Sequence, residues 1–539
     1  MVAAAGTGVL AGTVRVRPTP VRAPRRLAEL ALAIASALLY GWAFPPQPHR
    51  WLPWIALVPL LAVLRQAPAG RRLALTWVWT IAMAYTVNDW FPRAVSGYFT
   101  QPVAVGVALF LGVSTLTAGI QYMGFAAAYP RLAAGGRLAT PFVVAAAWVA
   151  ADLLRLRLFG GDPWALAGYS QVGVLPLMQI ADLTGVHGIT FLVVAVNAAI
   201  VEAGLAARAG RPGRAGAMLV PVAGALGLVL AYGGYRMQAS LSAGGSPVAV
   251  GIIQVDLPLG AQWRREFYGR NLDRYLRTTL DVLRDTRPRL VVWPESAMTF
   301  FVADEPAYRT SIASVLEGFG AELIAGGPHA AGDEPARFLN SAFHLAPDGE
   351  IRGRYDKRLL LPFAEYFPFG GLDLLRRSFG RVREFTPGEG PVPLLATALG
   401  PAGVIICNEG FFAAPAAARV RAGATVLVNL SNDSWLADAK YSEPAFDMVR
   451  LRAVEQRRWI VRASTAGPSA LIDPFGRVVA RTRLFETTAL SGTAEGHAVL
   501  TPYCRVGDLF AWTCAVVTVL MLVAGRSLAT RSAPRASRS

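Results

Sequence analysis

Eight apolar segments constrain this chain more than any other feature of its sequence. Seven recur before residue 236, near 28–44, 51–65, 73–91, 102–128, 139–154, 183–207 and 216–235, and an eighth lies near 506–525. Because about 20 apolar residues in a helix cross the hydrocarbon core of a bilayer, these segments predict a polytopic membrane protein with eight spans. Charged residues make up only 16% of the chain, against roughly 25% in soluble proteins, which excludes an ordinary soluble enzyme.

The positive charge of the chain lies beside the apolar segments. The net charge is +17, yet residues 236–505 hold 31 basic and 28 acidic side chains, so this region lacks the strong basic excess that nucleic-acid binding needs. With seven spans before residue 236, seventeen arginines fall on one side of the membrane, and four fall in the short loops of the other side: Arg50, Arg93, Arg155 and Arg157. The positive-inside rule makes the arginine-rich side cytoplasmic.

This count of spans predicts the organisation of the whole chain. Seven spans that start in the cytoplasm leave the following region on the outer side, and an eighth span returns the chain to the cytoplasm. The predicted parts are a cytoplasmic basic tail at 1–26, a seven-span membrane domain at 27–235, an outer domain at 236–505, an eighth transmembrane helix at 506–525 and a cytoplasmic tail at 526–539.

The outer region has the pattern of an α/β domain. Short β-branched runs at 248–254, 290–293, 403–406 and 425–429 are typical of buried strands, and helical patterns lie near 264–284, 306–318, 411–421 and 443–457. Asp348-Gly349 and Pro474-Phe475-Gly476 predict turns between paired strands. Strands that alternate with helices and hairpins indicate a layered α/β domain with mixed sheets.

Three side chains in the outer region follow predicted strands and can carry chemistry. Lys357 is one of only two lysines among 52 basic residues, and lysine supplies a compact charge that arginine does not reproduce. The other lysine, Lys440, is expected on a solvated surface. Cys407 closes an apolar strand, where a nucleophile is accessible at the rim of a sheet. Glu295 closes another strand, where burying a carboxylate is costly unless it is paired or takes part in the chemistry.

Each of the three also has a structural interpretation: a solvated lysine, a small buried cysteine and a carboxylate paired at a strand end. A lysine that lowers the pKa of the thiol favours the nucleophile. The remaining cysteines, Cys504 and Cys514, lie before and within the last apolar segment and are expected to be packing residues. The sequence contains no Cys/His signature, metal-ligand cluster or glycine-rich phosphate loop, so no metal, nucleotide or other cofactor is expected.

Glu295, Lys357 and Cys407, in this order, resemble the catalytic triad of the nitrilase superfamily. The surrounding motifs resemble one branch of it, the bacterial apolipoprotein N-acyltransferases, over nearly the whole chain. These motifs are Asp162-Pro-Trp164, Gly168-Tyr-Ser-Gln171, Gln254 with Pro258 and Trp263, Trp293-Pro-Glu295, Asn340-Ser341, Tyr355-Asp-Lys-Arg358, Pro362-Phe-Ala-Glu-Tyr366, Ser431-Asn-Asp-Ser-Trp435, Arg450-Leu-Arg-Ala-Val-Glu455 and Thr501-Pro-Tyr503. Seven spans before the outer domain and one after it also match this branch.

The resemblance implies a nitrilase-like αββα sandwich on the periplasmic side of a multi-pass protein of the bacterial inner membrane. The implied reaction transfers an acyl chain from a membrane phospholipid, through a cysteine thioester, to the N-terminal α-amino group of a diacylglyceryl apolipoprotein. The phospholipid and the apolipoprotein are then the partners, with no cofactor and no nucleic acid, and a monomer is expected.

The resemblance also implies a role for each candidate residue. Glu295 would act as the general base, Lys357 would stabilise the thiolate and the oxyanion, and Cys407 would be the nucleophile. Glu365 and Glu409 would support the site.

Trp263 would contact lipid near the entrance.

Three stretches depart from the family pattern: Asn408 stands where the family commonly has Tyr, residues 441–447 lack a common His, and residues 87–90 read Val-Asn-Asp-Trp. Two other functions stay open, namely a membrane-anchored nitrilase-type amidohydrolase acting on another substrate, and a non-catalytic lipid- or lipoprotein-binding paralogue.

Overall fold

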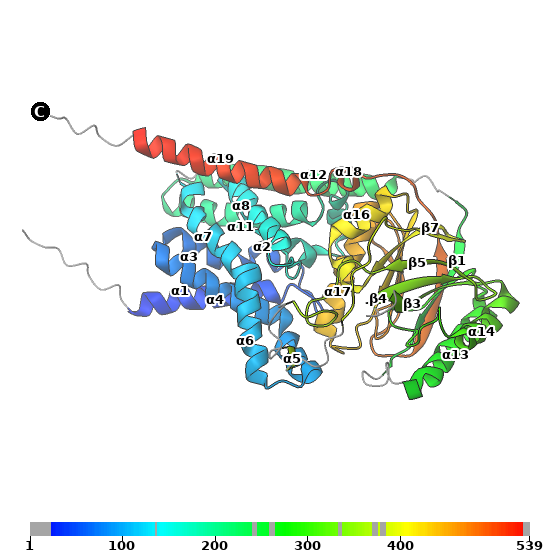
Figure 1. The fold of residues 1–539 in the computed structure, drawn as a ribbon. Helices are drawn as coiled ribbons and strands as arrows, with labels where there is room; N and C mark the ends of the chain where they lie inside the picture. The colour runs from blue at the N-terminus through cyan, green and yellow to red at the C-terminus, as the bar shows by residue number, and fades with distance from the viewer. Residues whose placement is uncertain are drawn as a thin grey trace, which may run out of the picture.

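The computed structural model describes residues 23–134, 137–239, 245–257, 265–331, 337–368, 376–377 and 384–531. Residues 23–239 form a helical unit, and residues 245–506 form a two-sheet unit that lies against one end of it (Figure 1). The last helix, α19 (Leu509–Arg531), leaves the two-sheet unit and packs along the helical unit, chiefly on α8 (Thr140–Arg157).

Helices occupy all eight predicted apolar segments. Besides α8 and α19, the helical unit contains α1 (Ala23–Gly41), α2 (Pro53–Ala56), α3 (Val58–Gln66), α4 (Ala69–Asn88), α5 (Trp90–Phe99), α6 (Val103–Ser114), the π-helical η1 (Thr115–Gly119), α7 (Ile120–Leu132), η2 (Ala167–Gln171), α9 (Leu175–Met178), α10 (Ala181–Thr184), α11 (Val186–Arg208) and α12 (Pro212–Gln238). Within the described residues, three helices are long and apolar enough to cross a membrane: Val103–Leu132, Val186–Arg208 and Pro212–Gln238. The other five spans stay a prediction.

The segment predicted as one span near 73–91 is divided between two helices. α4 ends at Asn88 and α5 begins at Trp90, which leaves Asp89 at the junction. Pro92 would break a continuous helix, but it is tolerated in the first turn of a new one, where no N–H needs a partner. α5 then pairs with α6 as a hairpin beside the two-sheet unit (Figure 1).

Ion pairs gather the helix ends into two groups. At one end, Arg71 of α4 pairs with Glu29 of α1 at 2.8 Å, and Arg65 of α3 pairs with Glu202 of α11 at 3.0 Å. The start of α1 and the end of α19 lie at this end, away from the sheets (Figure 1). At the opposite end, charged groups of the helical unit bond to the two-sheet unit.

The described strands form two six-stranded sheets, with strand orders β12-β1-β2-β3-β4-β5 and β11-β10-β9-β8-β7-β6. The strands are β1 (Val248–Gln254), β2 (Leu290–Val292), β3 (Glu322–Ala331), β4 (Arg337–Leu345), β5 (Ile351–Asp356), β6 (Leu395–Thr397), β7 (Gly400–Ile406), β8 (Val426–Ser431), β9 (Ile460–Ser464), β10 (Ala470–Ile472), β11 (Val478–Arg481) and β12 (Thr488–Ala494). β1, β2 and β3 are parallel, as are β7, β8 and β9, and the outer pairs are antiparallel. The predicted mixed sheets are confirmed.

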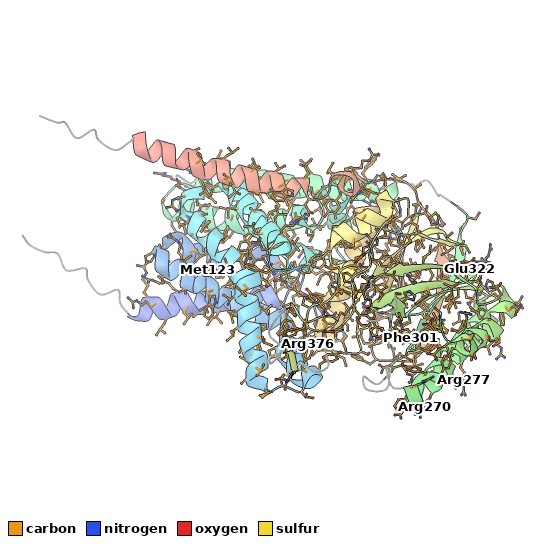
Figure 2. The ribbon with its side chains drawn as sticks, viewed as in Figure 1. Met123, Arg270, Arg277, Phe301, Glu322 and Arg376 are labelled. Carbon is orange, nitrogen blue, oxygen red and sulfur yellow. The ribbon has the colours of Figure 1, made fainter. Side chains whose placement is uncertain are left out.

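The sheets pack face to face because strand residues point alternately to opposite faces. In β1, Val250 and Ile252 belong to the core between the sheets, whereas Ile253 belongs to the core under the outer helices. α13 (Tyr268–Thr286) and α14 (Pro306–Leu316) cover the first sheet, while α16 (Ala413–Arg421) and α17 (Ala439–Gln456) cover the second (Figure 1). The predicted αββα sandwich is confirmed. The exposed Arg270 and Arg277 point outward from α13 (Figure 2).

Candidate active site

The fold brings together the three side chains that the sequence singled out. Glu295 follows β2, Lys357 follows β5 and Cys407 follows β7, so residues from both sheets meet at strand ends. The Lys357 Nζ lies 2.7 Å from Glu365 Oε2 and 3.4 Å from Glu295 Oε1. Lys357 is only 1% exposed and Cys407 only 4% exposed. Interactions with the Cys407 thiol contribute to the pKa values of both Glu295 and Lys357, so the three groups are neighbours.

Asn340 completes this cluster, although the sequence indicated it only as part of a family motif. Its Nδ2 donates to Glu295 Oε1 and to Glu365 Oε1, both at 2.7 Å, from the buried part of β4. The signal in the sequence is the pair Asn340-Ser341 in the middle of the strand Arg337–Leu345. By bonding to both carboxylates, Asn340 fixes them on either side of Lys357. The second oxygen of Glu295, Oε2, is buried without a hydrogen-bond partner among the described residues.

The backbone turns sharply at Cys407. Cys407 has φ of +51°, a left-handed conformation that non-glycine residues rarely adopt. It begins a 3-10 turn, η5 (Cys407–Phe411), which leads into α16. A residue at such a strand-to-helix turn points its side chain out of the sheet. The turn therefore presents Cys407 at the rim, as the sequence predicted.

Glu409 holds this turn in place. Its Oε2 accepts from the Ile406 backbone N–H at 2.9 Å, and its Oε1 accepts from the Tyr355 hydroxyl at 2.6 Å and the Arg358 backbone N–H at 3.0 Å. Arg419 of α16 lies 3.3 Å from the same carboxylate. One buried carboxylate thus ties the end of β7 to the segment that carries Lys357, so Glu409 contacts the scaffold of the site.

Electrostatics make the resting thiol neutral. Burial is the largest effect and raises the pKa of Cys407; the Glu295 carboxylate raises it further, and Lys357 lowers it. Lys357 lowers the pKa of the thiol, as expected, but burial outweighs this effect. Burial also raises the pKa of the Glu295 carboxyl against the lowering effect of Lys357. The pKa of Lys357 is raised by Glu365 and Glu295, so its ammonium stays charged.

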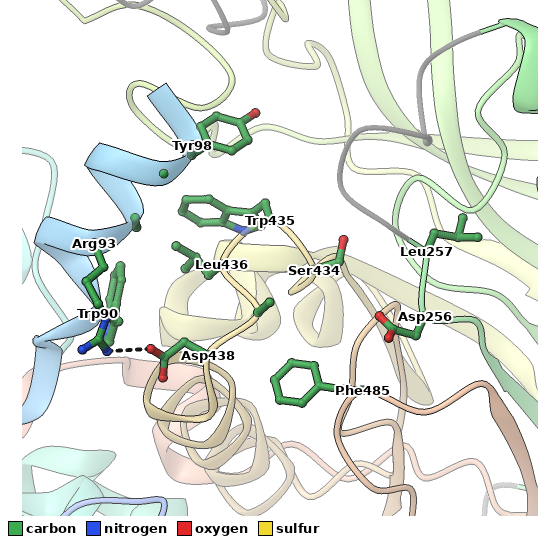
Figure 3. Close-up of a pocket in the computed structure, with 13 residues that line it drawn as sticks. Trp90, Arg93, Tyr98, Asp256, Leu257, Ser434, Trp435, Leu436, Asp438 and Phe485 are labelled. Carbon is green, nitrogen blue, oxygen red and sulfur yellow. Dashed lines mark hydrogen bonds and ion pairs between the residues drawn. The ribbon is translucent and has the colours of Figure 1, made fainter. Parts of the chain in front are cut away.

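A pocket of about 620 Å³ lies between the two units (Figure 3). α5 forms one wall, and the segments after β1, β8 and β11 form the other. Arg93 of α5 pairs with Asp438 across it at 2.8 Å. Trp90 and Trp435 line the pocket and also contact Tyr441, with ring centroids 5.1 and 5.7 Å apart.

The remaining predicted residues divide into three cases. Trp263 belongs to residues 258–264, outside the described residues, so its lipid contact stays a prediction. Cys504 and Cys514 are buried in apolar clusters, as expected of packing residues. Lys440, expected on a solvated surface, is partly exposed but pairs with Asp89 at 2.9 Å. This pair joins α17 to the junction of α4 and α5.

Two family models match the chain. The model of the apolipoprotein N-acyltransferase N-terminal domain matches residues 36–199, and that of carbon-nitrogen hydrolase matches residues 269–495. Together they cover most of both units.

Curated relatives match almost end to end. The apolipoprotein N-acyltransferase of Geobacter metallireducens is 33% identical over 92% of this chain and 95% of its own length. Those of Ralstonia nicotianae and Caulobacter vibrioides are 30% and 31% identical over 93% and 89% of this chain, and over 95% and 91% of their own. Among solved structures, the NitFhit protein of C. elegans matches 49% of this chain and 64% of its own, with 18% identity and a TM-score of 0.38.

Proposed function

This chain belongs to the apolipoprotein N-acyltransferase family, and on that premise we propose that it transfers an acyl chain from a membrane phospholipid to the α-amino group of a diacylglyceryl apolipoprotein. The reaction proceeds in two halves through a thioester on Cys407. Glu295, Lys357 and Cys407 carry the chemistry, and Glu365, Glu409 and Asn340 hold them.

In the first half, Cys407 Sγ attacks the ester carbonyl carbon of the phospholipid. Because the thiol is neutral at rest, its proton must leave as the carbon–sulfur bond forms, and the unpartnered Oε2 of Glu295 takes it. Lys357 then stabilises the negative oxygen of the tetrahedral intermediate. When the carbon–oxygen ester bond breaks, Glu295 returns the proton to the departing lysophospholipid oxygen.

In the second half, the free amine of the apolipoprotein attacks the thioester carbonyl. Glu295 takes a proton from the amine, the carbon–sulfur bond breaks, and Cys407 regains a proton as the amide is released. The same three side chains serve both halves of the reaction.

The observation that carries the proposal is the location of the nucleophile turn against the helical unit. Trp164 packs on Phe411 of this turn with ring centroids 5.7 Å apart, and Arg452 donates to the Phe411 carbonyl and to the Tyr169 hydroxyl at 3.2 and 3.0 Å. A soluble substrate needs no such neighbour. A lipid substrate does, because it arrives from the bilayer that surrounds the apolar helices.

We also propose that all eight apolar segments span the inner membrane and that the two-sheet unit lies in the periplasm. The arrangement of the arginines supports this topology. Arg65 and Arg71, from the arginine-rich set, lie at the end of the helical unit away from the sheets, and Arg93 and Arg157, from the sparse set, bond to Asp438 and Asp508 at the other end.

A direct test follows the acyl group. Purified protein is incubated with phospholipid that carries a labelled acyl chain, and the mass of the peptide containing Cys407 is measured. A stable acyl adduct that is transferred to a diacylglyceryl peptide supports the proposal. Cys407→Ala should form no adduct, whereas the double variant Cys504→Ala with Cys514→Ala, which removes only packing cysteines, should acylate normally. Release of free fatty acid without transfer would favour a hydrolase instead.

A further inference from the structure

Tyr441 has a fixed ring and an unsatisfied hydroxyl. The residue is 3% exposed, and its hydroxyl has no hydrogen-bond partner among the described residues. Its ring is surrounded by those of Trp90, Trp164, Trp435 and Phe411, with centroids 5.1, 5.4, 5.7 and 6.3 Å away. A buried hydroxyl without a partner destabilises the folded protein, so a hydroxyl held rigidly in this state is available for a ligand.

Tyr441 packs beside the turn that begins at Cys407, with its ring 6.3 Å from that of Phe411 in this turn. Tyr441 is in the first turn of α17, which packs on η5, the turn that begins at Cys407. Of the ionisable groups that act on the hydroxyl, Cys407 has the largest effect, followed by Asp433 and Glu295. Burial and these groups raise the pKa of Tyr441, so the phenol remains a neutral donor at any working pH.

A second hydrogen-bond donor would help the site, because Lys357 already bonds to carboxylates. Lys357 Nζ is bonded to Glu365 at 2.7 Å and lies 3.4 Å from Glu295. An oxyanion at Cys407 therefore shares Lys357 with two carboxylates, and a second donor without a carboxylate partner would stabilise that oxyanion more in the transition state than in the ground state.

We propose that Tyr441 is a further catalytic residue, whose hydroxyl donates a hydrogen bond to the carbonyl oxygen of the acyl group while that oxygen carries negative charge. This inference rests on the proposed function. In each half of the reaction the hydrogen bond forms as the carbonyl carbon becomes tetrahedral and is lost as the carbonyl is restored. The phenol keeps its proton throughout.

Tyr441→Phe tests the proposal, because it removes one oxygen and keeps the ring in its aromatic surroundings. We expect acyl-enzyme formation from phospholipid to slow about 10²-fold with no fall in melting temperature. Tyr275→Phe is the matched control: Tyr275 is also buried in the two-sheet unit with an unpartnered hydroxyl, but lies on α13. It should acylate at the wild-type rate.

Alkylation of Cys407 by iodoacetamide separates the proposed role from an effect on the thiol. In this reaction the sulfur of Cys407 attacks a saturated carbon, and no oxyanion forms. Cys407 in Tyr441→Phe should therefore be alkylated as fast as in the wild-type protein. The inference would be overturned if Tyr441→Phe formed the acyl-enzyme at the wild-type rate. It would also be overturned if the variant lost as much of its alkylation rate as of its acylation rate. Failure of the wild-type protein to acylate at all would instead overturn the proposed function.

Discussion

The protonation of Glu295 depends on neighbours that act in opposite directions. Burial and Glu365 raise the pKa of its carboxyl, while Lys357 and the hydrogen bond from Asn340 lower it. The balance lies above the ordinary value for glutamate, which suits a group that must take a proton from a neutral thiol and return it. Asn340 therefore has a measurable effect on the pH at which the site works.

We expect Asn340→Ala to move the acid limb of the pH–rate profile of acyl-enzyme formation to higher pH. Removing Asn340 takes away a donor that favours the ionised carboxyl, so the raised pKa of Glu295 rises further and less base is present at a given acid pH. The measurement is the rate of acylation across the acid range. Ser341→Ala, whose hydroxyl donates to Asp356 and not to Glu295, is the control. An unshifted limb in Asn340→Ala would contradict the assignment of Glu295 as base.

Lys357 and Lys440 provide a matched pair of substitutions. Lys357→Arg should slow acyl-enzyme formation by at least about 10²-fold, because the larger planar guanidinium cannot place its charge at the same point beside Glu365 and Cys407. Lys440→Arg should stay close to wild type, since either cation pairs with the partly exposed Asp89. Acylation rates at equal expression test both. Near-normal acylation by Lys357→Arg would remove Lys357 from the reaction.

The cluster of Glu295, Lys357 and Cys407 was predictable because each residue follows a strand that its own local sequence reveals. The family motif named Asn340 without a role, and nothing in the local sequence singled out Tyr441. Each reaches the site through contacts with segments far away in the chain, and no local period encodes such contacts. The pKa of Cys407 was also beyond the sequence, because a motif names Lys357 but not the depth of burial that outweighs it.

Helices and strands were predicted best where the apolar residues of a segment follow a single period. The strand predicted at 248–254 is β1, and α14 begins at Pro306, the predicted start. The break between α4 and α5 was missed because hydropathy continues through it, although Pro92 was visible in the sequence. The break sets the start of α5, which forms a wall of the pocket between the two units.

Short helices also connect the two units. Asp182 of α10 is buried and lies 2.7 Å from the buried Arg457 that ends α17, and it accepts from Arg236 and Tyr232 of α12 at 3.0 and 2.7 Å. Such a cluster holds α17, and with it Tyr441, against the helical unit.

Asp182→Ala should destabilise the protein by about 3–5 kcal/mol, because it leaves the buried guanidinium of Arg457 without its carboxylate. The measurement is unfolding of the detergent-solubilised protein. Asp273→Ala removes the exposed i,i+4 partner of Arg277 on α13 and should change stability by about 0.5 kcal/mol or less. Equal effects of the two substitutions would contradict a structural role for the buried pair.

At the scale of the whole molecule, the site depends on both units. Tyr441 and Phe411 come from the two-sheet unit, and Trp90 and Trp164 come from the helical unit, yet the four rings form one cluster beside the nucleophile turn. The proposed reaction, which takes both substrates from a bilayer, needs Cys407 at this boundary. The orientation of the molecule in the membrane is therefore part of the proposed function.

The proposed topology predicts which surface residues a membrane-impermeant maleimide can reach. The native cysteines Cys407, Cys504 and Cys514 are buried, so the background is low. Arg277→Cys, exposed on α13, should be labelled in intact spheroplasts, because the two-sheet unit faces the periplasm. Arg211→Cys, exposed between α11 and α12, should be labelled only after permeabilisation.

Arg211→Cys removes one of seventeen arginines from the cytoplasmic side, so the charge bias that orients the chain persists. The two positions lie on opposite sides of α12, one of three helices among the described residues that are long and apolar enough to cross a membrane. Labelling of both before permeabilisation would mean that α12 does not span. Labelling of Arg211→Cys alone would reverse the orientation and place the nucleophile in the cytoplasm, where the proposed reaction on exported lipoproteins could not occur.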